Sequence, residues 1–172
     1  MKTIVSPYQN HNNKLLGFTL IELVIVIVLI GILSAVALPK FASLTTQARQ
    51  SSAAGVAGGL ASAVGLAHAQ WLANGGGTAA SVTLEGQVIY LSTNGWPEDT
   101  AGSVSGVATA AKCLNVWNAV LNSPPQAAAG TCTVPCQYLV TGATTVCSYK
   151  DQQGTGTNII TYNISTGAVV SP

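Results

Sequence analysis

The sequence contains very little charge. Charged residues make up 6% of its 172 positions, whereas a typical soluble domain has about 25%. Six basic and five acidic residues leave a formal net charge of +1. Such a balance provides no basic patch, so it argues against nucleic acid as a partner. It also leaves little repulsion between copies of the chain, which favours self-association.

Groups that could perform catalysis are also scarce. Of the two histidines, His68 falls in an alanine-rich segment, where packing or a surface position is a better interpretation than a general base. The acidic residues form one cluster, Glu98 and Asp99. We interpret this pair as part of a solvated loop, with a calcium site as the alternative. The sequence therefore predicts no enzyme activity, no cofactor and no metal.

What the sequence does have is a long apolar run at residues 18–38. It can cross a bilayer as a helix, which takes about 20 residues. The alternative is a secretory signal, in which a small-residue cleavage site would lie at residues 34–37. The apolar core of such a signal is shorter, at about 7 to 15 residues. The length favours a membrane-spanning helix.

Glu22 is the only charged residue between Lys14 and Lys40, and it lies inside the apolar run. An ionised carboxylate at the centre of a membrane helix costs about 2.5 to 3.5 kcal/mol or more. A cation inside the membrane would offset this cost. The alternatives are that Glu22 reaches toward the interface or is protonated.

The helical composition continues beyond the membrane run to about Leu72. Gly31 and Pro39 interrupt its first half, and proline removes a backbone hydrogen bond, so we expect a kink or a locally melted stretch between them. In the second half, apolar residues recur at spacings of three and four and predict one packing face: Val56, Leu60, Val64, Ala67 and Trp71. Gly55 and Gly59 have the small-residue spacing that allows two helices to approach closely.

The remaining residues predict an α+β domain, because strands follow the helix without regular alternation. Two short strands at 82–84 and 87–91 flank the turn Glu85-Gly86, and a loop follows at 94–97. Helical spacing at 110–121, before Pro124, predicts a short amphipathic helix. Four antiparallel strands are expected after it, at residues 137–140, 145–150, 158–163 and 168–170.

The four cysteines all lie beyond the membrane run. An even number in an exported domain indicates two disulfides, for which three pairings are possible. Because Cys136 and Cys147 flank a plausible hairpin, we favour Cys113 with Cys132 and Cys136 with Cys147. The alternative is a four-thiolate zinc site, but only Cys132 and Cys136 approach the close spacing that such sites use.

The start of the apolar run carries a specific motif. Residues 17–27 read GFTLIELVIVI and follow a polar segment at residues 1–14. This string resembles the processing site of type IV prepilins. The segment 37–41, ALPKF, makes the resemblance closest to the mannose-sensitive haemagglutinin (MSHA) pilin group. It is strong over residues 14–50 and only general beyond them.

The resemblance implies a type IV pilin fold, with a long kinked N-terminal helix packed on a C-terminal antiparallel sheet. A membrane aspartyl peptidase would cut between Gly17 and Phe18 and methylate the new N-terminus. The Phe18 ammonium would then pair with Glu22 of a neighbouring subunit. A melted segment between Gly31 and Pro39 would let subunits fit the filament.

The same resemblance divides the chain into a leader at 1–17, an apolar helix half at 18–41, an amphipathic half at 42–73 and a globular domain at 74–172. The precursor would lie in the inner membrane with the pilus assembly machinery, and the assembled homopolymer would be an extracellular filament for adhesion and attachment. Two alternatives are a pseudopilin of a type II secretion system and a monomeric membrane-anchored binding protein.

Overall fold

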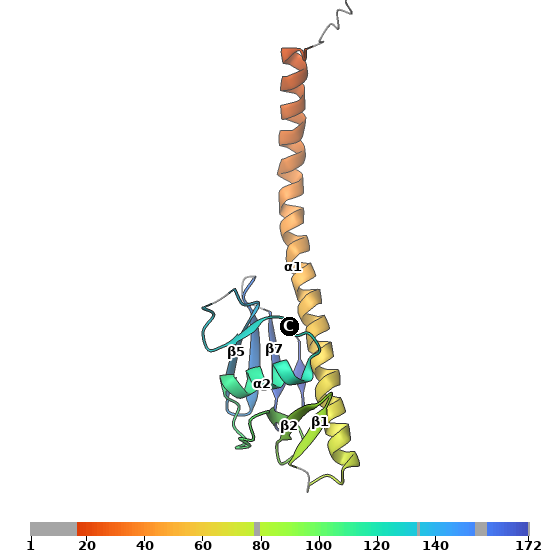
Figure 1. The fold of residues 1–172 in the computed structure, drawn as a ribbon. Helices are drawn as coiled ribbons and strands as arrows, with labels where there is room; N and C mark the ends of the chain where they lie inside the picture. Colours follow the sequence, from red (N-terminus) through yellow and green to blue (C-terminus); the bar gives the residue numbers. More distant parts are fainter. Residues whose placement is uncertain (1–16, 78–79, 134, 154–157, 172) are drawn as a thin grey trace, which may run out of the picture. The chain divides into compact units, whose positions relative to one another are not determined.

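The computed structural model describes residues 17–77, 80–133, 135–153 and 158–171 (Figure 1). The expected leader lies outside the described residues, apart from Gly17. The chain divides into two compact units, Met1–Ala42 and Ser43–Pro172, and each is considered by itself.

The first unit contains the beginning of helix α1, which extends over Leu20–Ala73. The backbone is helical throughout this range, and Pro39 lies inside the helix. The melted stretch expected between Gly31 and Pro39 is therefore absent from the described chain. A single missing backbone hydrogen bond does not have to end a helix whose neighbouring residues keep helical dihedrals. A break in the assembled state stays a prediction.

In the second unit, the last part of α1 packs along one face. Its buried residues recur at alternating spacings of four and three: Ala53, Ala57, Leu60, Val64 and Ala67. The predicted face is confirmed at Leu60, Val64 and Ala67, while Val56 and Trp71 are half-buried at its edges. A Cβ added at Gly55 would meet no atom within 4 Å, so the described chain does not use the small-residue spacing for close packing there.

The first sheet contains β1 (Ser81–Leu84), β2 (Gln87–Leu91) and β3 (Pro97–Asp99), all antiparallel. Glu85 and Gly86, between β1 and β2, both have positive φ, 48° and 84°. A two-residue hairpin of the right twist requires this conformation, and the predicted hairpin is confirmed. The loop predicted at 94–97 is only partly correct, because Pro97 begins β3, which pairs with β2.

The second sheet has five strands in chain order: β4 (Ala127–Ala129), β5 (Tyr138–Ala143), β6 (Val146–Asp151), β7 (Ile159–Asn163) and β8 (Val169–Val170). The predicted antiparallel meander is confirmed for β5 to β8. Strand β4 was not predicted, and it pairs parallel to β5. Three alanines carry no strand signal of their own, so β4 exists only through this tertiary pairing.

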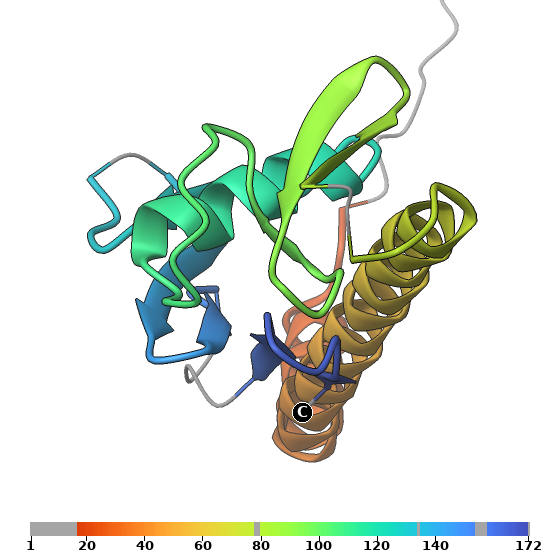
Figure 2. The same ribbon diagram turned by 90° about the horizontal axis from the view of Figure 1, so that it is seen from below.

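Helix α2 (Ala110–Val120) confirms the predicted amphipathic helix. Thr109 caps its N-terminus by accepting a hydrogen bond from the Lys112 amide at 3.3 Å. The helix contacts both sheets, mainly β5 and β3, and Figure 2 shows it between the β1–β2 hairpin and the blue strands of the second sheet. It therefore joins the two sheets into one domain.

Aromatic side chains fill the centre of this domain. Trp117 of α2 stacks on Tyr149 of β6 with ring centroids 4.5 Å apart. The Tyr149 hydroxyl donates to the Cys113 carbonyl at 3.0 Å, and the Tyr162 hydroxyl donates to the Pro97 carbonyl at 2.8 Å. Burial raises the pKa of both tyrosines well above the usual range, so the hydroxyls stay neutral donors. These bonds connect the second sheet to α2 and to β3.

All four cysteines are disulfide-bonded, but the favoured pairing was wrong. The bonds are Cys113–Cys147 and Cys132–Cys136, with Cα atoms 5.5 and 6.0 Å apart. Cys113 lies on the buried face of α2, which packs over β6 and the buried Cys147. In the hairpin register Cys147 lies opposite Gly142, near the end of β5. Cys136 precedes the start of that strand at Tyr138, so Cys147 does not lie beside it. Because the four sulfurs are used in these bonds, the zinc alternative has no thiolates to bind the metal.

We expect the two disulfides to contribute unequally to stability. Replacing Cys113 and Cys147 with alanine opens a loop of sequence separation 34, which lowers the free energy of unfolding by about 4 kcal/mol in the chain-entropy account. The same change at Cys132 and Cys136 opens a separation of only 4 and costs about 2 kcal/mol. Chemical denaturation of the solubilised subunit measures both, and the second double variant is the matched control. Equal losses would contradict the expectation.

Candidate processing and assembly site

The predicted cleavage site lies just before the first helix. Gly17 and Phe18 have no helical assignment, and both are exposed. The Phe18 side chain is 91% exposed. Because the Gly17–Phe18 bond lies outside the helix, a peptidase can reach it without unwinding α1. Within the described residues, the geometry of this segment is compatible with processing.

Thr19 and Glu22 form a reciprocal cap on the N-terminus of α1. The Thr19 amide donates to Glu22 Oε2 at 2.9 Å, and the Thr19 hydroxyl donates to the same oxygen at 2.9 Å. In return, the Glu22 amide donates to Thr19 Oγ1 at 3.3 Å. This is the arrangement of a capping box, in which a threonine and a glutamate three residues later satisfy backbone donors that the helix leaves free.

The cap gives the Glu22 carboxylate hydrogen-bond partners within its own chain. The sequence predicts a cation as the compensation for this charge, whereas in the structure the Thr19 amide and hydroxyl already donate to the carboxylate. The positive end of the helix dipole also favours a negative charge in the first turn. Thr19 was the residue that sequence reasoning missed. Its signal was present, because a threonine three positions before a glutamate, ahead of an apolar run, is the pattern of this cap.

The apolar residues of the first unit are uncovered on all sides. From Phe18 to Phe41 the large apolar side chains are between 42% and 91% exposed. An 18-residue window of α1 reaches a mean hydropathy of 3.0 with no residue buried, and among the described residues α1 alone is long and apolar enough to cross a membrane. A helix that is apolar all round needs lipid or other protein as its surroundings.

The acidic pair in the globular domain is not solvated, and that interpretation was wrong. Glu98 and Asp99 are 1% and 2% exposed. Lys112 Nζ lies 2.7 Å from Glu98 Oε1, which also accepts bonds from the Ser105 and Gly106 amides. Lys112 comes from the buried face of α2. The pair is therefore part of the domain interior rather than an exposed loop.

Asp99 is held by a separate set of donors. Burial opposes its ionisation, but the Asn115 side chain and the amides of Thr100, Ala101 and Ser103 outweigh burial and hold the pKa of Asp99 below its usual value. These hydrogen bonds favour the charged form. The carboxylate orders the segment that follows β3.

His68 is packed, as predicted. Its ring lies parallel to that of Trp96 with centroids 3.9 Å apart, and it also stacks on Trp71. Its Nδ1 is 3.0 Å from the Gly95 carbonyl. These contacts hold the loop between β2 and β3 against the end of α1, so His68 has a structural role in the domain.

Comparison with known proteins first identifies the class of the N-terminal segment. Residues 13–38 match the family model of the prokaryotic N-terminal methylation motif. This segment contains Gly17, Phe18 and Glu22. The motif, the uncovered apolar helix and the antiparallel C-terminal sheet with a short second helix agree with the type IV pilin fold.

Individual relatives give a more particular likeness. The chain is 54% identical over 54 residues to the type IV narrow pilus major component PilA5 of Thermus thermophilus, covering 31% of this chain and 47% of that protein. It is 45% identical over 78 residues to a fimbrial protein of Neisseria meningitidis serogroup A, covering 42% of this chain and 46% of the relative. It is 38% identical over 76 residues to the fimbrial protein EcpC of Eikenella corrodens, covering 42% and 50%.

The chain thus aligns with about half the length of the curated relatives it matches. No solved structure matches the chain significantly. The relatives are pilins and fimbrial proteins, which are structural proteins rather than enzymes. This likeness supports a structural role and does not favour the pseudopilin alternative.

Proposed function

We propose that this protein is the structural subunit of a type IV pilus, a filament of many copies used for adhesion and attachment. The observation that carries the proposal is the methylation motif at residues 13–38 at the start of a helix whose large apolar side chains are exposed from Phe18 to Phe41. A membrane surrounds this helix before assembly, and neighbouring helices surround it afterwards. When neighbouring helices replace lipid around this helix, its apolar side chains stay out of water, so little apolar burial is lost.

In this proposal the peptidase cuts between Gly17 and Phe18 and methylates Phe18. The subunit waits in the inner membrane with the assembly machinery and leaves it as part of an extracellular homopolymer. The helix opens between Gly31 and Pro39 as subunits adopt the filament symmetry. The segment 37–41 supports a place in the mannose-sensitive haemagglutinin group.

Cleavage also changes the surroundings of Glu22. The new ammonium of Phe18 lies next to Thr19, whose amide and hydroxyl already contact the carboxylate. We infer that Glu22 binds the Phe18 ammonium of an adjacent subunit in the filament. Opposite charges in a low dielectric attract strongly, although desolvation cancels much of the gain. The pairing therefore sets the register of subunits more than it adds stability.

Mass spectrometry of the protein from filament-producing cells tests the processing. We expect the mature N-terminal peptide to begin at methylated Phe18. A Gly17→Val variant should accumulate as the uncut precursor, because a β-branched side chain replaces a residue with none next to the scissile bond. An intact Met1 terminus in cells with an active peptidase would contradict the proposal and favour a monomeric membrane-anchored protein.

A further inference from the structure

Most charged side chains of residues 43–172 have a partner within the same chain. Residues 43–172 contain three cations, Arg49, Lys112 and Lys150, and four acidic residues, Glu85, Glu98, Asp99 and Asp151. Lys112 pairs with Glu98, and Arg49 lies 4.0 Å from Asp151. Asp99 binds Asn115 and backbone amides. Within the described part of the chain, this leaves the side chains of Glu85 and Lys150 without an ion pair or hydrogen bond.

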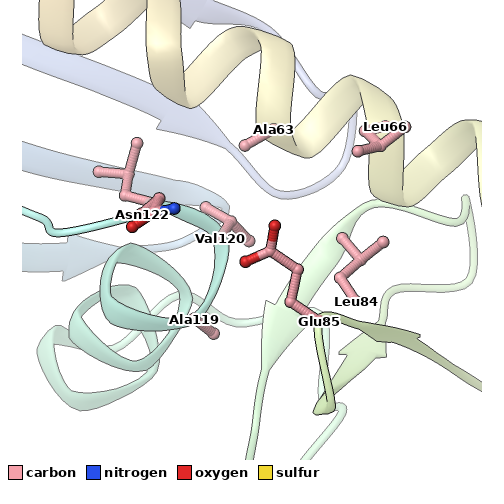
Figure 3. Close-up of a pocket in the computed structure, with 8 residues that line it drawn as sticks. Ala63, Leu66, Leu84, Glu85, Ala119, Val120 and Asn122 are labelled. Atoms are coloured by element: carbon pink, nitrogen blue, oxygen red, sulfur yellow. The ribbon is translucent and has the colours of Figure 1, made fainter.

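Glu85 lies at the mouth of a small pocket. The pocket is formed where the β1–β2 turn approaches α1 and the end of α2, and apolar side chains dominate its lining: Ala63, Leu66, Leu84, Ala119, Val120 and Leu121. Figure 3 shows the Glu85 carboxylate directed into this space between Val120 and Leu84. The rim is partly open, since Leu66 is 61% exposed. An acid thus faces an apolar recess.

The size of the pocket limits what can occupy it. Its volume of about 110 Å³ is well below the 300 to 1,000 Å³ of ordinary small-molecule sites. A single long side chain fits better. Lysine places an apolar stem against apolar surface while its ammonium stays with polar groups. The ligand that suits this pocket is therefore one long cationic side chain. Among the described residues of 43–172, Lys150 is the cation without a partner, since Arg49 and Lys112 are paired.

Lys150 is exposed on β6 at the other end of the domain. Its neighbour Asp151 is buried and contacts Arg49 of α1, and alternate residues of a strand point to opposite faces, so Lys150 points away from α1. The pocket lies at Ala63 and Leu66, about four turns further along α1 and so about 20 to 25 Å away. The two groups are too far apart to meet within one chain.

We propose that Lys150 of one copy enters the Glu85 pocket of a second copy. This inference rests on the proposed function, because the partner is another subunit of the filament. A contact between two different patches at opposite ends of a molecule is head-to-tail, and such contacts build rings when the rotation closes and open helical filaments when it does not. The open form is the one that a pilus subunit needs. Charge complementarity also sets which patches meet. The pair fixes the register between neighbouring globular domains.

Charge reversal in full-length protein tests the contact. Glu85→Lys and Lys150→Glu should each lower the filament mass sheared from cells about tenfold, because like charges then face each other across the interface. The double variant should return to within about twofold of wild type, since the charges again attract. Immunoblots and thermal unfolding of the unassembled subunit show whether each variant is folded.

A matched control combines Glu85→Lys with Thr131→Glu and Thr133→Glu, which restores the same net charge at two exposed positions of another loop. This combination should not rescue assembly. The pairing is wrong if single reversals assemble normally, if the double variant is no better than the singles, or if the two loop substitutions rescue equally well. A wild-type strain without filaments would refute the proposed function itself, whereas failed rescue alongside normal wild-type filaments refutes only this contact.

Discussion

Glu22→Val is expected to prevent filament growth while the protein still enters the membrane. The change removes the only charge from residues 18–38. Insertion becomes easier, by less than the roughly 2.5 to 3.5 kcal/mol that an acid at the helix centre costs, because Glu22 lies in the first turn of α1. The Phe18 ammonium of the incoming neighbour loses its partner. A buried charge whose partner is removed costs about 3 to 5 kcal/mol, which corresponds to more than a hundredfold in an assembly equilibrium.

The capping box provides controls that separate charge pairing from helix capping. Glu22→Gln keeps a side chain that can complete the box but removes the charge. Thr19→Val removes the hydroxyl that contacts Glu22 but keeps the carboxylate, at a cost of about 1 kcal/mol of helix stability. If pairing is the function of Glu22, the glutamine variant fails to assemble and the valine variant at position 19 assembles.

Sheared filament yield and the amount of membrane-bound subunit, measured on the same cells, report the outcome. Normal filaments from Glu22→Gln would show that capping is sufficient. Loss of filaments from Thr19→Val alone would lead to the same conclusion. Either result would contradict the electrostatic pairing and would leave Glu22 with a structural role in the cap.

The second large effect is expected in the globular domain at Lys112. Its ammonium is buried with Glu98 and also donates to Ser105 Oγ at 2.8 Å. Lys112→Met keeps a side chain of similar length but leaves the Glu98 carboxylate buried without its counterion. We expect the free energy of unfolding to fall by about 3 to 5 kcal/mol, the usual result of breaking a buried pair.

The double variant Lys112→Met with Glu98→Gln distinguishes a lost charge partner from lost packing. The amide oxygen of glutamine can still accept bonds from the Ser105 and Gly106 amides, which now bind Glu98 Oε1. With both charges gone, more than half of the loss should be recovered. Denaturant unfolding of the solubilised subunit measures all variants, and Lys150→Met is the control for the same change at an exposed lysine, expected within about 0.5 kcal/mol of wild type. A double variant as unstable as Lys112→Met would mean that packing, not charge, explains the effect.

Elements with a local signal were predicted correctly. The β1–β2 hairpin follows from Glu85-Gly86 between two short apolar runs, and α2 from its spacing before Pro124. The packing face of α1 follows from the positions of Leu60, Val64 and Ala67. In each case neighbouring residues specify the structure, since turn chemistry and helical periodicity act over a few positions.

The processing and assembly roles of Gly17, Phe18 and Glu22 stay predictions. The motif placed Gly17, Phe18 and Glu22 together, and the family model covers them. The cap made by Thr19 could have been predicted from the same residues. The Glu85 pocket could not, because its walls come from α1, α2 and β1, which lie far apart along the chain.

The sequence by itself determined the local features of this protein: an apolar helix with a processing motif at its start, one packing face further along, and strands separated by turns. The tertiary structure alone decided which distant residues meet. It placed Cys113 against Cys147 rather than Cys132, paired β4 with β5, and buried Glu98 beside Lys112. The reason is that hydrogen bonding and periodicity are short-ranged along the chain, whereas packing of α2 over the two sheets selects partners by their position in space.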